Sequence, residues 1–244
     1  MSDLTLHSRD RVACVVGGTG LIGSRLLRVL RRHPRYGRVV CVGRTDPQVP
    51  GVEWVSTVDV VGGTDTSAAS LSTRIETLVP SGHDFYSCLG TTRRDAGSAE
   101  AFEFVDYTLN LAYAKTAFAK GYSQYALVSS LGADPSSIFL YPRTKGKLEL
   151  AVKALPFWAT HIVQPSLLLG DRDRPRMGER IAAPMMRLAK PLLARVNPAG
   201  SPIDAEQVAN ALVAAVATAN RPGITTYTYR RIVELSGSLT KQLS

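Results

Sequence analysis

Short apolar runs alternate along the chain with longer segments in which apolar residues recur every three or four positions. The run VACVV, which ends before Gly17, is followed by a segment from Leu21 to His33 with the apolar spacing of a helix. Continuous apolar runs are typical of strands in a parallel sheet that helices cover on both faces. The alternation therefore predicts an α/β protein with a doubly wound parallel sheet, the Rossmann fold.

The same pattern can be followed to the end of the chain. The 244 residues suit one domain, 1–244, rather than two full domains. The predicted strands are 12–17, 38–44, 52–56, 83–90, 125–130 and 226–235, with one more within 160–170. The predicted helices are 21–33, 66–78, 99–120, 141–154, 178–195 and 204–219.

The net charge of +9 changes this picture little, because the basic residues are spread along the chain. The densest segment, GDRDRPRMGER, interleaves acidic residues with its arginines, whereas nucleic-acid-binding domains more often carry a basic stripe with aromatic residues. We therefore expect no nucleic-acid partner. The arginines of this segment could favour an anionic group on a small molecule, or they could form a solvated basic loop.

The cysteines and the apolar runs indicate the compartment. Cys14, Cys41 and Cys88 are odd in number, lie in apolar runs and lack the spacing of metal ligands. The N-terminus MSDLTLHSRDR has no apolar core of a signal peptide, and no apolar run is long enough to span a membrane. These features predict reduced, buried cysteines in a soluble cytoplasmic protein without a membrane or metal site.

The glycine-rich stretch GGTGLIG joins the first predicted strand to the first predicted helix. Gly17 can supply the tight turn, Gly20 lets the backbone approach a pyrophosphate, and Gly23 lets helix and strand pack closely. Free N–H groups at the start of the helix would then face the phosphates. A Walker loop would need a lysine where Gly23 stands, and an ordinary strand-to-helix turn is the remaining alternative.

The end of the second predicted strand indicates which dinucleotide is used. NAD-selective sites usually carry an acid there, whereas this chain has Arg44, whose guanidinium can hold a 2′-phosphate. The cofactor is therefore predicted to be NADP(H), unless Arg44 only faces solvent. Asp59, after the third strand, could accept a hydrogen bond from the adenine amine or could be a turn residue.

Candidate catalytic residues lie in SSLGADPSSIFLYPRTKGKLE. Tyr141 and Lys145 are one helical turn apart, and Pro142 suits the first turn of that helix. An ammonium beside a phenol favours the phenolate, which would make Tyr141 a usable acid or base near neutral pH. A Tyr–Lys pair is a weak signal alone, but this one follows a strand that ends in Ser129 and Ser130, at the edge where such sheets bind ligands.

Five segments together resemble the short-chain dehydrogenase/reductase superfamily, in its atypical branch related to nucleotide-sugar epimerases. They are GGTGLIGS, VGR, CLGTTRRDAGSAEAFEFVDYTLN, LVSSLGADPSSIFLYPRTKGKLE and VQPSLLLGDR. Within that branch the chain is most similar to the Tat-interacting NADPH-binding oxidoreductase group. The resemblance covers about residues 12–180 and implies a single NAD(P)-binding Rossmann domain, with 171–203 as a segment on the substrate side.

The resemblance also implies roles for individual residues. Tyr141 would be the catalytic acid/base, Lys145 would also bind the nicotinamide ribose, and Ser130 matches the catalytic serine, with Ser129 as the alternative. Gly90 and Thr91 would lie beside the cofactor, and the stretch from Pro165 to Leu168 would approach its carboxamide. The full set of predicted cofactor-binding residues is Gly17, Thr19, Gly20, Leu21, Ile22, Gly23, Arg44, Asp59, Val60, Leu89, Gly90, Thr91, Tyr141, Lys145, Pro165, Leu167 and Leu168.

Two features depart from the family pattern, and a third separates the chain from the sugar epimerases. Asp106 stands where family members often have Asn, which puts an Asn-dependent proton relay in doubt. The span from Ser130 to Tyr141 is short, so the reach of the serine is less certain. The C-terminal part is too small for the large substrate domain of sugar epimerases, which disfavours nucleotide-sugar chemistry without excluding it.

Three functions follow as hypotheses. The first is an NADPH-dependent reductase of a carbonyl-type small molecule, in which Tyr141 protonates the carbonyl oxygen. The second is an NADPH-binding regulator that acts through a protein partner, as members of the resembled group do. The third is a nucleotide-sugar epimerase or dehydratase that keeps its cofactor. The sequence leaves the substrate and the oligomeric state open.

Overall fold

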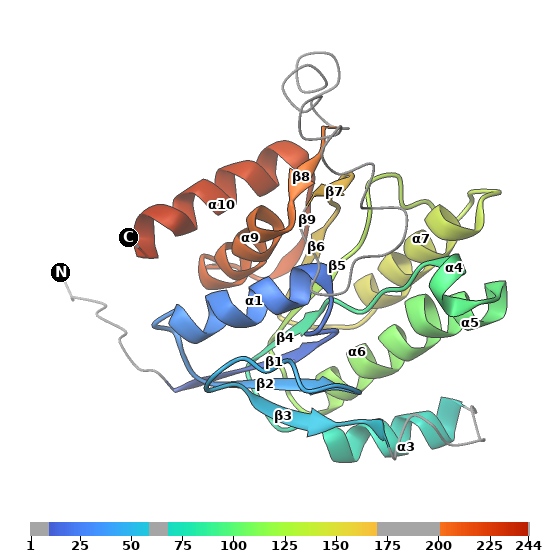
Figure 1. Ribbon diagram of the computed structural model, residues 1–244, viewed down its shortest axis with the longest axis horizontal. Coiled ribbons are helices and arrows are strands. Elements are labelled where there is room, and N and C mark those ends of the chain that lie inside the picture. Colours follow the sequence, from blue (N-terminus) through green and yellow to red (C-terminus); the bar gives the residue numbers. More distant parts are fainter. Residues whose placement is uncertain (1–9, 59–67, 170–200, 244) are drawn as a thin grey trace.

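A computed structural model describes residues 10–58, 68–169 and 201–243 (Figure 1). Asp59 and Val60, the helix predicted at 178–195 and most of the segment 171–203 lie outside these residues. In the described residues, parallel strands form one seven-stranded sheet in the order β3-β2-β1-β4-β5-β6-β9. The strands are β1 (Arg11–Val16), β2 (Tyr36–Gly43), β3 (Glu53–Ser56), β4 (Asp84–Ser87), β5 (Gln124–Val128), β6 (Ala159–Val163) and β9 (Gly223–Tyr227).

Helices cover both faces of this sheet (Figure 1). One face carries α1 (Leu21–Arg32), α9 (Ala205–Ala217) and α10 (Tyr229–Leu243), and the other carries α3 (Ala68–Leu78), α6 (Asn110–Ala119) and α7 (Leu140–Lys153). The remaining elements are α4 (Arg93–Ala96), α5 (Ala99–Glu103), η1 (Phe104–Leu109), β7 (Leu168–Leu169) and β8 (Ile203–Asp204). The predicted doubly wound Rossmann fold is therefore confirmed.

The side chains of β1 show why its sequence is apolar throughout. Ala13 and Val15 are fully buried against α1 and α9, whereas Cys14 and Val16 are fully buried in the core under α3 and α6. Because successive side chains point to opposite faces of a strand, a sheet covered on both faces needs apolar residues at every position. The strand order reverses at the β1–β4 neighbours, and such sheets bind ligands in the crevice outside the carboxyl ends of these strands.

The prediction of a strand over 226–235 is wrong beyond Tyr227, where the chain turns into α10. Ile232, Leu235 and Leu239 are spaced three and four apart and are buried on one side of this helix. The alternation of Tyr227 and Tyr229 is typical of a strand, but the helical spacing of the three buried residues buries more apolar surface. The strand predicted within 160–170 corresponds to β6, which ends at Val163.

The segment predicted as a helix over 99–120 is helical, with a feature that the periodicity does not reveal. It consists of α5, the π-helical turn η1 and α6 in unbroken succession. A π-helical turn adds a residue to the turn and rotates the side chains that follow it. This turn carries Asp106, which is fully buried.

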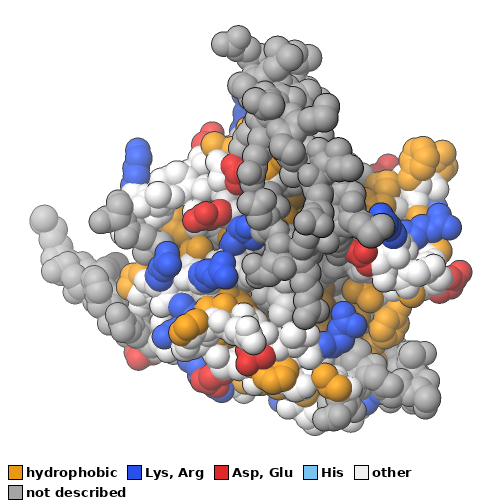
Figure 2. Space-filling view, in the orientation of Figure 1, with side chains coloured by type: hydrophobic (Ala, Val, Ile, Leu, Met, Phe, Trp, Pro, Cys, Tyr) orange, Lys and Arg blue, Asp and Glu red, His pale blue; other side chains and the backbone are white. Residues whose placement is uncertain are grey.

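The basic side chains stay scattered in the folded protein. Figure 2 shows lysine and arginine spread over the visible face rather than gathered in one stripe. Among the described residues, no helix is both long enough and apolar enough to cross a membrane.

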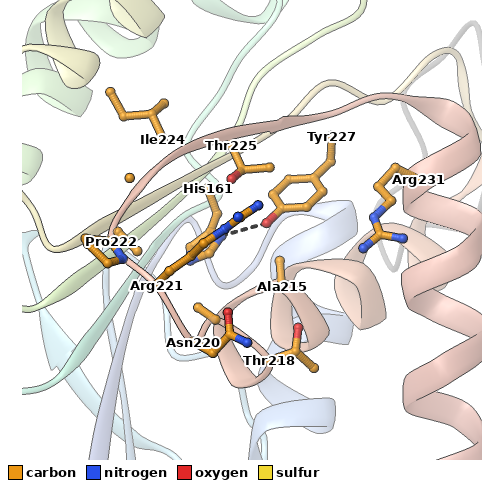
Figure 3. A pocket seen from close by; sticks show the side chains of 13 residues that line it. His161, Ala215, Thr218, Asn220, Arg221, Pro222, Ile224, Thr225, Tyr227 and Arg231 are labelled. Atoms are coloured by element: carbon orange, nitrogen blue, oxygen red, sulfur yellow. Dashed lines mark hydrogen bonds between the residues drawn. The ribbon is translucent and has the colours of Figure 1, made fainter.

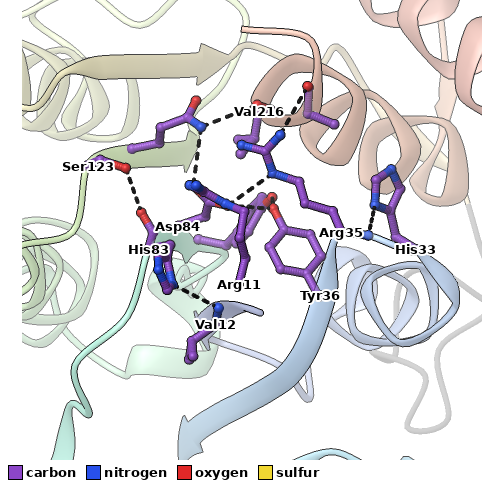
Figure 4. Close-up of polar contacts among 12 residues, drawn as sticks. Arg11, Val12, His33, Arg35, Tyr36, His83, Asp84, Ser123 and Val216 are labelled. Atoms are coloured by element: carbon purple, nitrogen blue, oxygen red, sulfur yellow. Dashed lines mark hydrogen bonds and ion pairs between the residues drawn. The ribbon is translucent and has the colours of Figure 1, made fainter. Parts of the chain in front are cut away.

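A buried polar network crosses the sheet below α9. Asp84, which is fully buried, accepts from Arg11 Nη2 at 2.6 Å, from the Tyr36 hydroxyl at 2.9 Å and from Gln124 Nε2 at 3.2 Å (Figure 4). Gln124 in turn meets His161 Nε2 at 3.0 Å, and the other ring nitrogen of His161 meets the Tyr227 hydroxyl at 3.0 Å. The network thus ties β1, β2, β4, β5, β6 and β9 together.

The buried imidazole of His161 makes folding stability depend on pH. Burial lowers the pKa of His161 to about 4, well below the value of about 6.5 in an unfolded chain. As the pH falls below about 6.5, the unfolded state takes up a proton that the folded state does not, so stability falls. Between pH 7 and pH 5 we expect a loss of about 2 kcal/mol from this group.

Urea unfolding of the wild type and of His161→Gln at both pH values measures this loss. The variant should lose less stability by that amount, while His83→Gln, at an exposed histidine, should behave as the wild type does. The pKa of His33 is also lowered, so the stability of both proteins keeps a smaller dependence on pH that they share. Equal losses in the wild type and His161→Gln would contradict the assignment.

Candidate functional site

The glycine turn between β1 and α1 has a conformation that side chains would not allow. Gly17 adopts a φ of +77°, and a Cβ there would come within 2.5 Å of the Cys88 backbone. A Cβ on Gly23 would collide with the Gly17 carbonyl, so α1 passes directly over the turn. Gly20 is the N-cap residue of α1 and donates its N–H to the Gly17 carbonyl at 3.1 Å.

The start of α1 is open to an anion. No side chain caps this helix, and its first turn contains no acidic residue. Gly20 is exposed, and a Cβ built on it would have the Gly17 carbonyl, at 3.2 Å, as its single neighbour within 4 Å. The first N–H groups of a helix have no partner within the helix, and they carry the positive end of its dipole. Thr19 is exposed beside them, whereas Leu21 and Ile22 are buried and fix the helix to the sheet.

Arg44 follows the end of β2 and is exposed, with no ion-pair partner among the described residues. The strand end is fixed by the Gly43 carbonyl, which accepts from Trp54 Nε1 at 2.9 Å and from the Thr57 N–H at 3.2 Å. The arginine is therefore presented at the carboxyl edge of the sheet, after the strand that lies next to β1. Asp59 and Val60, predicted to lie nearby, fall outside the described residues.

The loop that follows β4 is fastened to the helical segment 99–119. Asn110 is fully buried, and its amide donates to the carbonyls of Val105 at 3.1 Å and Leu89 at 3.4 Å. The Ser87 hydroxyl donates to the Asn110 side-chain oxygen at 2.5 Å. The predicted residues Leu89, Gly90 and Thr91 are thereby held at the carboxyl end of β4.

Below this loop lies an ion pair. The Lys145 ammonium is 2.7 Å from Asp106 Oδ1, and the exposed fractions of the two side chains are 5% and 0%. The other carboxylate oxygen accepts from the Thr91 N–H at 2.7 Å. Asp106 therefore joins the helix η1, the loop after β4 and the helix α7 at one point.

The two predicted serines have different surroundings. Ser129 is buried, and its hydroxyl donates to Glu149 Oε1 at 2.5 Å, an oxygen that also accepts from Gln164 Nε2 at 2.8 Å. Ser130 is half-buried, and its hydroxyl has a long 3.3 Å contact with the Leu131 carbonyl. Ser129 is thus occupied with Glu149, which leaves Ser130 as the serine with a hydroxyl that can turn to a ligand.

Tyr141 lies in the first turn of α7, with 45% of its surface exposed. Its ring packs against Phe102, with ring centroids 5.9 Å apart. A Cβ on Gly146 would overlap the backbone of Asp134, so the loop before α7 packs directly on this helix. Ser130, Tyr141 and Lys145 make no direct hydrogen bonds to one another, and their convergence on one substrate atom stays a prediction.

The stretch after β6 is fixed by its backbone. The Pro165 carbonyl accepts from the Leu131 N–H at 2.9 Å, and the Leu167 carbonyl accepts from the Ile203 N–H at 2.9 Å. Leu168 pairs with Ile203 in the small β7–β8 sheet. The Leu167 side chain is 52% exposed.

Sequence reasoning missed several polar partners in this region. It noted Asp106 as a departure from a family pattern but not as the partner of Lys145, and it did not consider Asn110, Glu149 or Gln164. The one local signal was the spacing of Lys145 and Glu149, which places both side chains on the same face of one helix. The contacts of Asp106 and Asn110 join segments far apart in sequence, so no local pattern could reveal them.

A separate cavity of about 310 Å³ lies among the end of α9, the strands β6 and β9 and the start of α10 (Figure 3). His161 and Tyr227 face each other within it, and Arg221 and Arg231 lie at its side. None of the predicted site residues lines this cavity. Among the described residues, no group of three or more His, Cys, Asp or Glu side chains is placed to hold a metal ion.

No family model matches the chain. Solved structures similar to it include MoeE5 in complex with UDP-glucose and NAD, at 15% identity and a TM-score of 0.63 over 94% of this chain and 82% of that one. The Helicobacter pylori ADP-L-glycero-D-manno-heptose-6-epimerase is similar at 16% identity and a TM-score of 0.60, over 97% and 83% of the two chains. At these identities the likeness shows the Rossmann-type fold alone.

Fungal proteins are much more similar in sequence. The protein fmp52 of Emericella nidulans is 38% identical over 168 residues, which are 69% of this chain and 71% of that protein. FMP52 of Debaryomyces hansenii is 38% identical over 162 residues, 66% and 69% of the two chains. These names do not include the Tat-interacting group, so that finer resemblance stays a prediction.

The prediction of a cytoplasmic protein is wrong by this comparison, because these relatives and that of Candida albicans are all named mitochondrial. The error came from treating reduced cysteines as a sign of the cytosol. Burial raises the pKa of Cys14 to about 12 and that of Cys41 to about 11, which disfavours the reactive thiolate, so these buried cysteines do not identify the compartment. At 38% identity over 71% of the Emericella nidulans protein, the chain belongs to the Fmp52 family.

Proposed function

We propose that this protein is a nicotinamide-dinucleotide-dependent enzyme that acts on an alcohol or carbonyl carbon of a small molecule. The observation that carries the proposal is the open start of α1 behind the glycine turn, at the carboxyl edge of a parallel sheet. A pyrophosphate needs N–H donors, a close backbone approach and no competing acid, and this turn offers all three.

The residues at this edge fit a dinucleotide. The pyrophosphate would be held by the turn, through Gly17, Thr19 and Gly20 and the first N–H groups of α1. Lys145, below the exposed Gly90, would donate to the nicotinamide ribose. The stretch Pro165–Leu168, with the exposed Leu167, would flank the nicotinamide end.

The proton chemistry would belong to Tyr141 and Ser130. Tyr141 is exposed, has its ring held by Phe102, and would give a proton to the substrate oxygen or take one from it. Ser130 would hold that oxygen, since Ser129 is engaged by Glu149. When bound, the dinucleotide would supply the hydride acceptor or donor that the chain itself lacks.

Arg44 supports NADP(H) as the dinucleotide. An exposed guanidinium that pairs with no carboxylate among the described residues can form a bidentate, charge-assisted contact with a 2′-phosphate, worth about 1.5–3 kcal/mol. We expect the wild type to bind NADPH more tightly than NADH by about tenfold or more. Arg44→Ala should lose this preference while keeping its affinity for NADH.

Fluorescence titration of both dinucleotides into the wild type and Arg44→Ala measures the preference. Arg38→Ala is the matched control, because Arg38 lies on β2, the strand that leads to Arg44, but is already paired with Glu53 at 2.7 Å. Equal affinities in the wild type would rule out the role of Arg44. A wild type that binds neither dinucleotide would overturn the proposed function itself.

An epimerase that retains its cofactor is the second candidate, and the structural likeness to nucleotide-sugar enzymes favours it. MoeE5 was solved with NAD and UDP-glucose, and the likeness covers 94% of this chain. A reductase oxidises NADPH with each turnover, whereas an epimerase returns the hydride and shows no net oxidation. Incubation with carbonyl compounds or with UDP-sugars, followed by nicotinamide absorbance and product analysis, separates the two.

A further inference from the structure

The contacts of the Asp106–Lys145 ion pair fix the position of the lysine ammonium. Both carboxylate oxygens of Asp106 are engaged, one by the Lys145 ammonium at 2.7 Å and one by the Thr91 N–H at 2.7 Å. The lysine can therefore neither leave nor rotate without breaking contacts that also hold the loop after β4. Lys145 has no second partner for its ammonium among the described residues, so the N–H groups that do not face Asp106 stay available to a ligand.

Stability does not explain this pair. Removing two charges from water costs about as much as their attraction returns, so a buried ion pair often contributes little to folding. The pair is also held by a π-helical turn, a distortion that occurs frequently at functional sites. The contacts of Asn110 with Val105 and Leu89 fix this turn to the loop.

The pair lies directly below an exposed glycine. A Cβ on Gly90 would be 3.4 Å from Asp106 Oδ1 and 3.5 Å from Lys145 Nζ. A ligand lying on Gly90 therefore reaches the ammonium without moving the chain. Because the carboxylate compensates its charge, Lys145 offers donors for neutral hydroxyl groups rather than a net charge for a phosphate.

We propose that Asp106 is a positioning residue that holds Lys145 under Gly90 for the neutral diol at the nicotinamide end of the dinucleotide. This inference rests on the proposed function. Asp106 does not itself touch the dinucleotide, so its effect passes through Lys145. Removing the carboxylate charge should then weaken the whole dinucleotide but not its adenine half.

The test compares NADPH with 2′,5′-ADP by calorimetry in the wild type, Asp106→Asn, Lys145→Met and the double variant. Asp106→Asn should weaken NADPH by about 10- to 100-fold and 2′,5′-ADP by less than about twofold. The double variant should bind NADPH no more weakly than Lys145→Met, because Asp106 then has nothing left to position. Glu103→Gln, a carboxylate-to-amide change on the same helical segment, should leave both affinities unchanged.

Each other outcome is decisive. Unchanged NADPH affinity in Asp106→Asn overturns the inference, and so does an equal loss for both ligands, which marks a general structural role. If Asp106→Asn alone does not fold, the comparison of Lys145→Met with the double variant remains, and a further loss in the double variant overturns the inference. A wild type that binds neither ligand overturns the proposed function instead.

Discussion

Gly20→Val is expected to lose dinucleotide binding by at least about 100-fold while the protein stays folded. The side chain would occupy the space in front of the first N–H groups of α1, where two charge-assisted hydrogen bonds to the pyrophosphate would form. The backbone at Gly20, with φ of −75° and ψ of 172°, is one that valine adopts readily. A Cβ there has a single neighbour within 4 Å, so we expect a stability loss of no more than about 1 kcal/mol.

Two other glycines separate binding from folding. Gly23→Val should lose stability as well as binding, because its side chain would collide with the Gly17 backbone below α1. Gly237→Val lies on α10 with nothing within 4 Å of an added Cβ, so it should keep both. Calorimetric titration and thermal unfolding of the three variants test this. Gly20→Val with wild-type affinity would place the dinucleotide elsewhere.

Tyr141→Phe is expected to lower turnover by about 10²- to 10⁴-fold, the usual contribution of a positioned proton donor. The phenyl ring can keep its contact with Phe102, so the affinity for the dinucleotide should change little. Steady-state kinetics with a substrate found among the carbonyl compounds or UDP-sugars, together with dinucleotide titration, checks both parts.

The matched control for Tyr141→Phe is Tyr229→Phe, the same change at a half-buried tyrosine of α10. It should leave turnover and affinity unchanged. Undiminished turnover in Tyr141→Phe would remove the tyrosine from the mechanism. If no substrate is found and the cellular activity survives this change, the better interpretation is a regulator that binds NADPH and acts through a protein partner.

The sheet and the glycine turn could be predicted because their signals are local. The apolar run of β1 and the glycines at 17, 20 and 23 each indicate the local structure of the segment in which they lie. The end of the chain shows where local signals compete. Tyr227 and Tyr229 alternate as in a strand, but Ile232, Leu235 and Leu239 gain burial as a helix, and the helix forms.

The polar part of the site could be predicted only in part. Tyr141 and Lys145 were identified by their spacing, but the partner of Lys145 comes from a helix 39 positions earlier in the chain. The choice between Ser129 and Ser130 depended on Glu149, whose contact with Ser129 arises from packing α7 against the end of β5. Neither contact follows from periodicity, because both depend on tertiary packing.

A crystal structure of the protein with NADPH tests the central claim most directly. The account predicts the pyrophosphate against the first N–H groups of α1, the 2′-phosphate at Arg44 and the nicotinamide ribose at Lys145, with Asp106 still paired to the lysine. A dinucleotide bound at another place, such as the cavity beside His161 and Arg221, or no dinucleotide bound at saturating concentration, would contradict it.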